Sequence, residues 1–475
     1  MTRLQEIPWI EKIAADTNVI QPIPGDRLPL RLNLYRLRRL RPLLENRWPQ
    51  LLVRVLTLSG FVFSIAAGLA GSRVGSHNFA IIIIWIAWWT ALKLAFIPLG
   101  GRSWCSICPI PLPGDWLQQG GILPTRRQRF GLNLHWPRKL RGAWLQAGGF
   151  LLIGLFSAVT LTAPQVTSGV LIGLFALAIG LSLVFEHRAF CTYLCPVGGF
   201  SGMYAKLSPV EVRVIDKEIC AQHEVKSCYQ ACPWGLYPVA FRGSAACGLC
   251  MECLRICPKD NLALNIRTFG ADLGERKSAS RLDETGLALV MLGSVLAFSA
   301  VFLGPWGWLK SAAFGIGSHS WLAYSLGYLL INLVLLPGLF VLVVWWREKF
   351  IHDWKKLRQA IATQAQALFP LGLLVWIAFT IAFAFSKLNL VIGVLNDPLG
   401  WGWHWLGVIS TPSTIPVSSL ILLVEVGLLA AGLFWSASVT RKLSVEHGKR
   451  NTVRSLPVLV FSLVFTVMMM WLLVG

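Results

Sequence analysis

The chain has 475 residues, with 43 Lys and Arg against 22 Asp and Glu, yet only 14% of its residues are charged and 55% are hydrophobic. A net charge of +21 combined with this hydrophobicity excludes a soluble globular enzyme and a disordered chain. The basic residues border apolar stretches rather than forming an extended arm interleaved with aromatic residues. No nucleic-acid partner is therefore expected.

The apolar runs predict nine transmembrane helices, since about 20 apolar residues cross roughly 30 Å of hydrocarbon. Residues 1–50 are charged and contain prolines, so the first span itself is expected to act as the insertion signal. The predicted helices are Leu51–Gly71, Phe79–Gly100, Trp144–Thr162, Gly169–Phe185, Gly286–Leu309, Trp321–Trp346, Phe369–Leu395, Ile415–Trp435 and Leu456–Gly475.

The loops between these helices alternate sharply in charge. The segment before the first span and every second loop after it together hold 38 Lys and Arg, whereas the opposite loops hold only Arg73 and Lys310. Basic loops stay cytoplasmic, so this asymmetry predicts an N-terminus inside and a C-terminus outside. The expected location is the cytoplasmic (inner) membrane of a prokaryote, with membrane lipid as a direct partner.

The loop 187–285 is too long for a simple connector and holds nine of the eleven cysteines. All eleven lie on the side predicted to be cytoplasmic, where thiols stay reduced, so metal ligation is favoured over disulfides. The strongest motif is Cys247-x2-Cys250-x2-Cys253-x3-Cys257-Pro258, a spacing that binds iron–sulfur clusters.

A partner half precedes this run as Cys220-x7-Cys228-x3-Cys232-Pro233. In paired-cluster proteins the cysteine before proline serves the other cluster. The first cluster, a [4Fe–4S] centre, is therefore assigned by this rule to Cys232, Cys247, Cys250 and Cys253. The second is assigned to Cys220, Cys228 and Cys257.

The segment from Cys220 to Ile266 resembles a two-cluster bacterial ferredoxin, and its first half is similar to that of seven-iron ferredoxins. His223 stands where a further cysteine is expected. Three interpretations remain open: a [3Fe–4S] cluster, a [4Fe–4S] cluster with His223 as the fourth ligand, or a bystander histidine. Zinc in place of the clusters is disfavoured by the two crossed ligand sets.

The other four cysteines form a duplicated motif. Arg102-x2-Cys105-x2-Cys108-Pro109 follows the second helix, and Arg188-x2-Cys191-x3-Cys195-Pro196 follows the fourth. If the two hairpins pack side by side, the four sulfurs could hold a third metal or cluster, or act as a redox dithiol. The structural alternative is that they cap helices and stay reduced.

This pattern resembles the NosR/NapH family of membrane iron–sulfur proteins over residues 51–270, although the first motif is Cys-x2-Cys-Pro and five more spans follow. Members pass electrons between the quinone pool or cytoplasmic donors and periplasmic reductases. The resemblance implies an electron-transfer role with quinone, further redox subunits or a soluble electron donor as partners. A quinol dehydrogenase-type oxidoreductase component is one form of that role.

The predicted fold class is an α-helical polytopic membrane protein with an inserted cytoplasmic α+β two-cluster ferredoxin-like domain. The predicted parts are a basic cytoplasmic segment (1–50), a four-helix membrane unit with duplicated Cys-Pro motifs (51–200), the ferredoxin-like domain (201–285) and a five-helix membrane domain (286–475).

Ionisable residues inside predicted spans include Glu425 and Lys93. Glu425 is midway along its helix, where a carboxylate is costly, so it is a candidate for proton transfer or for a place beside quinone. A protonated Glu425 hydrogen-bonded within the bundle is the alternative. Lys93 is expected to extend its amine toward the cytoplasmic membrane edge.

Together these features predict a membrane-bound iron–sulfur protein that exchanges electrons between cytoplasmic clusters and the quinone pool, serving a respiratory reductase or oxidase system. Two alternatives remain. One is an assembly or maturation factor for a metal centre, and the other is a non-catalytic anchor subunit of a redox complex.

Overall fold

The computed structural model describes residues 20–21, 31–122, 130–222, 227–241, 243–273, 281–347, 353–407, 419–446, 449–450 and 452–474. Within these ranges the chain is predominantly helical, and eight helical segments are long and apolar enough to cross a membrane. They are Trp48–Ala70 (α3), Phe79–Gly100 (α4 through α6), Pro164–Val184 (α11), Leu282–Phe302 (α16), His319–Arg347 (α18 through α19), Trp354–Phe385 (α20 through α21), Ser419–Leu443 (α23) and Ser455–Val474, which is most of α24 (Thr452–Val474).

These eight segments confirm eight of the nine predicted spans, and the third is shorter than expected. Trp144–Leu155 (α9) ends at Phe156, whose φ of −97° and ψ of 12° interrupt the helix before Ser157–Thr160 (α10). Gly148 and Gly149 lie within α9, where glycine lowers helix propensity. The apolar run is therefore divided where an unbroken helix was predicted.

The predicted span Phe369–Leu395 is also divided. Leu368–Phe385 (α21) ends at Ser386, and Asn389–Asn396 (α22) begins after a short turn. At its other end α21 continues from Trp354–Gln364 (α20) through one turn of 3-10 helix. The span therefore begins earlier and ends earlier than its hydrophobicity indicated.

The second span contains two π-helical stretches, Ile82–Trp88 (η3) and Leu92–Phe96 (η4). Lys93 lies in the second and is only 1% exposed. Its Nζ lies 5.1 Å from the ring centroid of Trp89 and 5.0 Å from that of Trp376. The prediction that Lys93 reaches the membrane edge is therefore wrong, because aromatic ring faces surround its ammonium group inside the bundle.

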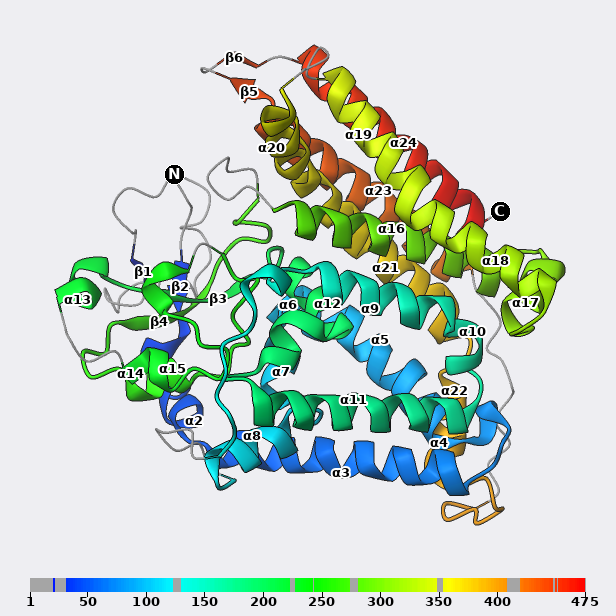
Figure 1. Ribbon diagram of the computed structural model, residues 1–475, viewed down its shortest axis with the longest axis horizontal. Coiled ribbons are helices and arrows are strands. Elements are labelled where there is room, and N and C mark those ends of the chain that lie inside the picture. The colour runs from blue at the N-terminus through cyan, green and yellow to red at the C-terminus, as the bar shows by residue number, and fades with distance from the viewer. Residues whose placement is uncertain are drawn as a thin grey trace.

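A four-stranded antiparallel sheet lies at one end of the helices (Figure 1). Its order is β1 (Ile20–Gln21), β2 (Arg31–Asn33), β4 (Leu262–Ile266) and β3 (Val210–Val214). Strand β2 pairs Leu32 with Ile266 and Asn33 with Asn265. Residues that precede the first membrane helix therefore complete the sheet of the cysteine-rich region.

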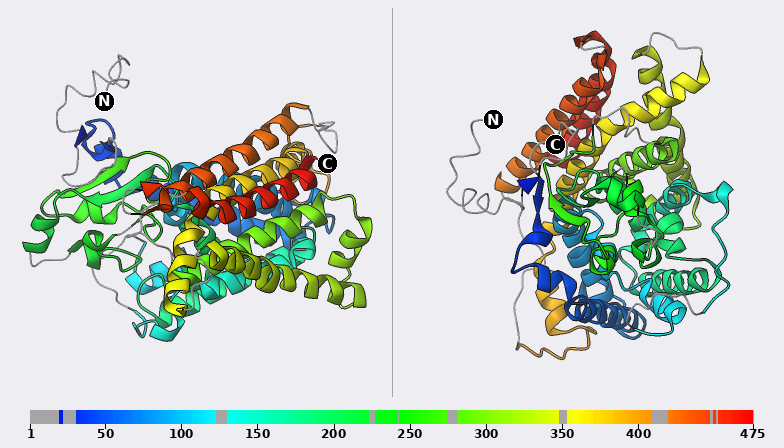
Figure 2. Two further views of the ribbon diagram at one scale, coloured as in Figure 1. Left: turned by 90° about the horizontal axis from the view of Figure 1, so that it is seen from above. Right: turned by 90° about the vertical axis from the view of Figure 1, so that its left-hand side faces the viewer.

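Most of the membrane helices extend from the sheet end toward the opposite end of the molecule, as the left view of Figure 2 shows. Helix α11 packs against α3, and α21 packs against α16, α23 and α24. Trp376 of α21 is fully buried beside Phe150 of α9 and Phe200 of α12 (Pro196–Tyr204). The core therefore joins the first four membrane segments to the C-terminal ones.

Short elements complete the fold. They are η1 (Leu34–Arg36), α2 (Arg41–Glu45), η2 (Gly75–His77), α7 (Ser103–Ile107), α8 (Leu112–Gln119), η5 (Arg138–Leu140), η6 (Phe190–Leu194), α13 (Lys217–Gln222), α14 (Ser227–Gln230), η7 (Pro238–Ala240), α15 (Glu252–Ile256), α17 (Gly307–Phe314), β5 (Val445–Glu446) and β6 (Lys449–Arg450).

Candidate metal centre

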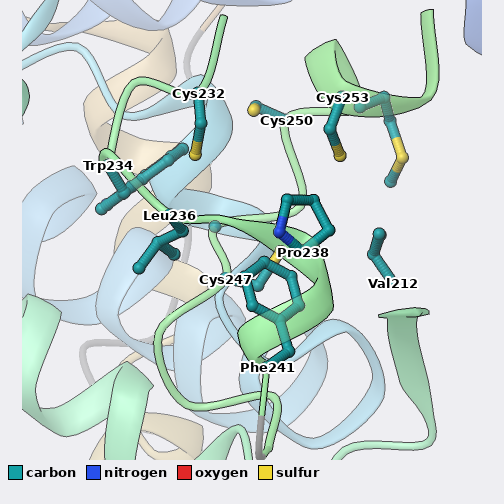
Figure 3. A pocket seen from close by; sticks show the side chains of 11 residues that line it. Val212, Cys232, Trp234, Leu236, Pro238, Phe241, Cys247, Cys250 and Cys253 are labelled. Carbon is teal, nitrogen blue, oxygen red and sulfur yellow. The ribbon is translucent and has the colours of Figure 1, made fainter. Parts of the chain in front are cut away.

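Four cysteines line one small pocket beside the sheet. Cys232 follows α14, Cys247 and Cys250 lie in the loop before α15, and Cys253 lies within α15. Figure 3 shows Cys232, Cys250 and Cys253 reaching the pocket from separate stretches of backbone, with Trp234 and Leu236 close to Cys232. These are the four residues that the crossed-ligand rule assigns to the first cluster.

The loop that carries these cysteines has an unusual backbone. Leu249 and Met251 both adopt left-handed conformations, with φ of 51° and 64°, which few non-glycine residues do. Gly248 lies between Cys247 and Cys250, and a Cβ on it would overlap the indole ring of Trp234. The loop therefore turns tightly around the pocket and needs a glycine where the indole packs.

The electrostatics of the pocket reflect the proximity of its thiols. Burial, with a smaller contribution from Cys232, raises the pKa of Cys250 to about 12. Burial and the neighbouring Cys250 also raise the pKa of Cys247 to about 11. The backbone N–H groups of Glu252 and Leu249 act in the opposite direction on these two thiols. Such N–H groups would stabilise thiolate sulfur in a cluster.

The second predicted set, Cys220, Cys228 and Cys257, lies next to the first. Burial raises the pKa of Cys228, and the neighbouring thiols of Cys257 and Cys220 raise it further. Asn261 donates its Nδ2 hydrogen to the Sγ of Cys220 at 3.3 Å, and its backbone N–H to the Sγ of Cys257 at 3.4 Å. His223 lies outside the described residues, so its predicted role stays a prediction.

Cys105, Cys108, Cys191 and Cys195, here called the quartet, also come together. Burial raises the pKa of Cys108, and Cys195 and Cys105 raise it further. Burial is the main cause that raises the pKa of Cys195 to about 11, and its Sγ accepts a hydrogen bond from the backbone N–H of Gly198 at 3.3 Å. The two hairpins therefore pack side by side, which was the condition for the four sulfurs to come together.

Two buried arginines connect the halves of the duplicated motif. Arg102 donates from Nη2 to the carbonyl oxygen of Cys191 at 3.2 Å, and Arg188 donates from Nη1 to that of Cys105 at 2.8 Å. Each arginine is 5% exposed. The Nε of Arg188 also donates to Asp115 at 2.9 Å, so an ion pair compensates its buried charge.

The same arginines reach the cysteine-rich loops. Arg102 donates to the carbonyl oxygen of Ala245, two residues before Cys247, at 3.1 Å. The backbone N–H of Arg188 donates to Pro233 at 2.8 Å, and its guanidinium lies 4.7 Å from the ring centroid of Trp234. The quartet and the first cysteine pocket are therefore held by shared residues.

Direct packing also connects these two sets. Cys105, Trp234 and Cys250 form one buried cluster, and Cys232 and Leu236 pack against it. The quartet therefore packs directly against residues that line the pocket of Figure 3. The indole of Trp234 lies at their common boundary.

The segment before the first membrane helix and the first turn of that helix support the first pocket from outside. Arg255 of α15 donates to the carbonyl oxygen of Leu44 at 2.9 Å and to Gln50 at 3.1 Å. Arg47 pairs with Glu252 at 2.8 Å. Sequence reasoning missed these contacts because they join positions about two hundred residues apart.

Several other residues of the site were not predicted. The shared Arg-x2-Cys spacing marked Arg102 and Arg188, but no pattern indicated Asp115, Trp234 or Asn261. An Asn four residues after the last cysteine of the run was the available signal for Asn261.

Glu425 is not brought to the cysteines. It is 1% exposed in α23, a helix that packs chiefly on α21 and α24. Neither carboxylate oxygen accepts a hydrogen bond from a described residue. The alternative of a hydrogen-bonded Glu425 finds no partner there, and a functional role for this residue stays a prediction.

Among the described residues, no three or more His, Cys, Asp and Glu side chains have the spacing of a site for a single metal ion. The donor chemistry fits an iron–sulfur cluster instead in two respects. Thiols approach each pocket from separate backbone segments, and N–H groups point at their sulfurs.

A family model described as a 4Fe-4S binding domain matches residues 81–133 and 167–214. These ranges contain all four cysteines of the quartet and exclude the run that begins at Cys247. The chain therefore contains a ferredoxin-type iron–sulfur domain, and the match lies on the duplicated hairpins.

Curated relatives point the same way. The methylamine utilization ferredoxin-type protein MauN of Paracoccus denitrificans is 29% identical over 30% of this chain and 52% of its own length. MauN of Methylorubrum extorquens is 31% identical over 30% of this chain and 50% of its own length. An uncharacterized protein of Methanocaldococcus jannaschii is 26% identical over 46% of this chain and 83% of its own.

The chain thus spans about half the length of the MauN proteins that it matches, and is their distant homologue. No solved structure matches it. An iron–sulfur domain of ferredoxin type on a multi-pass membrane protein indicates electron transfer.

Proposed function

We propose that this protein is an electron-transfer protein of the prokaryotic cytoplasmic membrane that exchanges electrons between iron–sulfur clusters and the quinone pool. The observation that carries this proposal is the packing of Cys105 against Trp234 and Cys250. This contact makes the quartet and the first cysteine pocket neighbours. Cys228 in turn lies close to Cys253, so the second set adjoins that pocket as well, and we infer that the three sets of thiols form a continuous row.

The ligands follow from this row. Cys232, Cys247, Cys250 and Cys253 would hold a [4Fe–4S] cluster. Cys220, Cys228 and Cys257 would hold a second, of three or four irons, with His223 as the candidate fourth ligand. Cys105, Cys108, Cys191 and Cys195 would hold a third, a choice supported by the family model that covers them. Such clusters accept and donate single electrons when bound.

The chain's own residues would support this chemistry in two ways. Arg102 and Arg188 fix the distance between the quartet and the first pocket through the carbonyl groups that they bind. The N–H groups of Asn261 and Gly198 stabilise negative charge on sulfur. Glu425 is the candidate for proton transfer within the membrane.

The resemblance to the NosR/NapH family and the distant homology to MauN both favour service to a larger redox system, with a respiratory reductase or oxidase as the proposed partner. The predicted orientation places the iron–sulfur region in the cytoplasm. We keep the predicted domain boundaries at residues 50, 200 and 285 as part of this proposal. Strand β2, however, belongs to the predicted N-terminal segment and pairs with the sheet of the ferredoxin-like region.

The test is anaerobic purification in detergent, with iron and sulfide counted per chain and EPR spectra recorded before and after addition of a quinol. Three clusters predict about eleven or twelve irons, with signals that the quinol reduces. Cys105→Ser with Cys191→Ser should remove about four irons and leave the signal of the first pocket. Ser103→Ala serves as the matched control.

Two outcomes would overturn the proposal. Zinc without iron would exclude electron transfer by this chain. Intact clusters that no quinol reduces would favour a maturation factor or an anchor subunit in place of quinone exchange.

A further inference from the structure

A second cavity, of about 270 Å³, lies on the other side of the quartet. Its walls come from the first turns of α9 and α16, from α12, from residues 192–193 of η6 and from the loop residues 245–246. Thr192 and Tyr193 lie between two cysteines of the quartet, and Ala246 precedes Cys247. The cavity therefore adjoins the backbone of two cysteine sets at once.

Three glycine residues form the floor of this cavity. Gly198, Gly199 and Gly202 of α12 all line it, so a ligand can approach the backbone of this helix closely. A Cβ on Gly202 would lie 3.1 Å from the carbonyl oxygen of Ala245 and 3.5 Å from Nη1 of Arg102. Larger residues here would fill the cavity and press on the arginine that connects the cysteine sets.

One buried side chain in the wall has an unused acceptor. Gln146 is 6% exposed, and its Nε2 donates to the carbonyl oxygens of Cys191 at 3.4 Å and Thr192 at 3.2 Å. Its Oε1 accepts no hydrogen bond from the described residues. A Cβ placed on Gly199 would lie 3.2 Å from this Oε1, so the amide oxygen borders the glycine floor. A ligand with a hydrogen-bond donor would satisfy it.

Two of the four charged residues in the wall have a partner of opposite charge. Arg281 pairs with Asp283, and Glu284 pairs with Lys206 at 2.6 Å. Arg102 and Arg141 then supply donors, whereas Met203 and Leu287 supply apolar surface. A free anion would be attracted by the two arginines but would leave the Gln146 oxygen and the apolar surface without a partner. A ring with hydroxyl or carbonyl oxygens and apolar substituents matches all three kinds of group. Its oxygens can bond to the arginine donors and to the Gln146 acceptor, and its apolar substituents can contact the apolar surface.

We propose that this cavity binds the headgroup of a membrane quinone, with Gln146 accepting a hydrogen bond from its hydroxyl form and Arg102 or Arg141 donating to its carbonyl form. The choice of quinone over other ligands of this shape rests on the proposed function. Helix α16 starts at the cavity and runs on as a membrane span, so the cavity lies at the end of a membrane helix.

The test measures binding of decylubiquinone to the intact iron-loaded protein in detergent by titration calorimetry. Gln146→Leu is expected to weaken Kd about tenfold, because it removes the acceptor, and Arg141→Gln is expected to weaken it less. Gln118→Leu is the matched control, since Gln118 is also buried and also donates to backbone carbonyl oxygens but does not line the cavity. Arg138→Gln is the control for Arg141.

A photoreactive azidoquinone provides a second measurement that does not depend on the variants. It should label peptides from residues 192–203 or 281–287 in wild-type protein, and labelling there should fall in Gln146→Leu. Iron content is measured on each sample, so a variant that loses its clusters is recognised.

The outcomes separate the two proposals. Binding that is equal in Gln146→Leu and in Gln118→Leu, with labelling elsewhere, would overturn this site and leave quinone exchange standing. Binding at the site with clusters that no quinol reduces would overturn the proposed function and keep the site. Displacement of the azidoquinone by phosphatidylglycerol vesicles but not by decylubiquinone would assign the cavity to a lipid headgroup, against the proposal.

Discussion

Arg102 and Arg188 each extend from one half of the duplicated motif to the other. Each donates a hydrogen bond to the carbonyl oxygen of the first cysteine in the other half, Cys191 and Cys105 respectively. The two hairpins are therefore fixed to one another at the positions where their sulfurs meet. The two copies of the sequence motif therefore form one structural unit.

The first prediction concerns this connection between the two halves. Arg188→Gln should reduce the iron bound by the quartet and lower the free energy of unfolding by about 3–5 kcal/mol, because it leaves Asp115 buried without its partner. Iron content and thermal unfolding in detergent measure both effects. Arg188→Lys keeps the charge but not the fork of donors, so it should lie between wild type and Arg188→Gln. Unchanged iron in Arg188→Gln would contradict the prediction.

The second prediction concerns Asn261. Its side chain donates to the Sγ of Cys220, and a hydrogen bond of this kind stabilises the more negative, reduced state of a cluster. Asn261→Leu should therefore make the reduction potential of the second cluster more negative by about 20–60 mV, the equivalent of one hydrogen bond. An EPR-monitored redox titration measures the shift. Asn265→Leu, a buried position on β4 without a hydrogen bond to sulfur in the described structure, should leave the potential unchanged.

The third prediction tests the packing of Trp234. Gly248→Ala would place a methyl group inside the indole ring, so the loop or the ring must move, at a cost of about 1–3 kcal/mol. Iron bound by the first pocket should fall. Trp234→Leu in the same chain should restore part of it by making room. Gly60→Ala is the control, because nothing lies within 4 Å of the added methyl; an equal loss there would refute the packing argument.

The fourth prediction is a pH dependence. Burial acts to raise the pKa of Asp272, but the hydrogen bond and charge of Arg267, aided by Arg213, outweigh it and hold the pKa below 3.8. A carboxylate whose pKa is lowered by folding adds stability that is complete above its unfolded pKa and is lost as pH falls through the folded one. The difference in unfolding free energy between wild type and Asp272→Asn should stay constant from pH 7 to about 5 and shrink below about pH 4. Unfolding curves across this range decide it, and a difference that shrinks already between pH 7 and 6 would exclude Asp272 as its source.

Hydrophobic length was sufficient to predict most of the membrane helices. It failed at Phe156 and Ser386, where an apolar run is interrupted by a change in backbone conformation rather than in hydrophobicity. It also failed at Lys93, whose amine was expected at the membrane edge. The reason is that three aromatic rings from two helices surround it, and one of these helices lies almost three hundred residues further along the chain.

The cysteines that the spacing rule groups together, Cys232 and Cys247–Cys253, line one pocket, and their role as ligands of one cluster stays a prediction. The neighbours of that pocket were beyond such a pattern. Leu44 reaches it, and Asp115 reaches the neighbouring Arg188, only through tertiary packing, and no short motif records a contact between a side chain and a distant group.

The pairing of β2 with β4 has a consequence for the order in which this protein is made. Strand β2 leaves the ribosome before the first membrane helix, and its partner at residues 262–266 leaves only after four hydrophobic segments have been handed to the insertion machinery. Strand β2 lacks its partner β4 during that interval. Closing the sheet is therefore a late step of biogenesis, and the cysteine-rich region cannot be cut out as one continuous fragment without losing β1 and β2, which would expose β4 as a new edge strand.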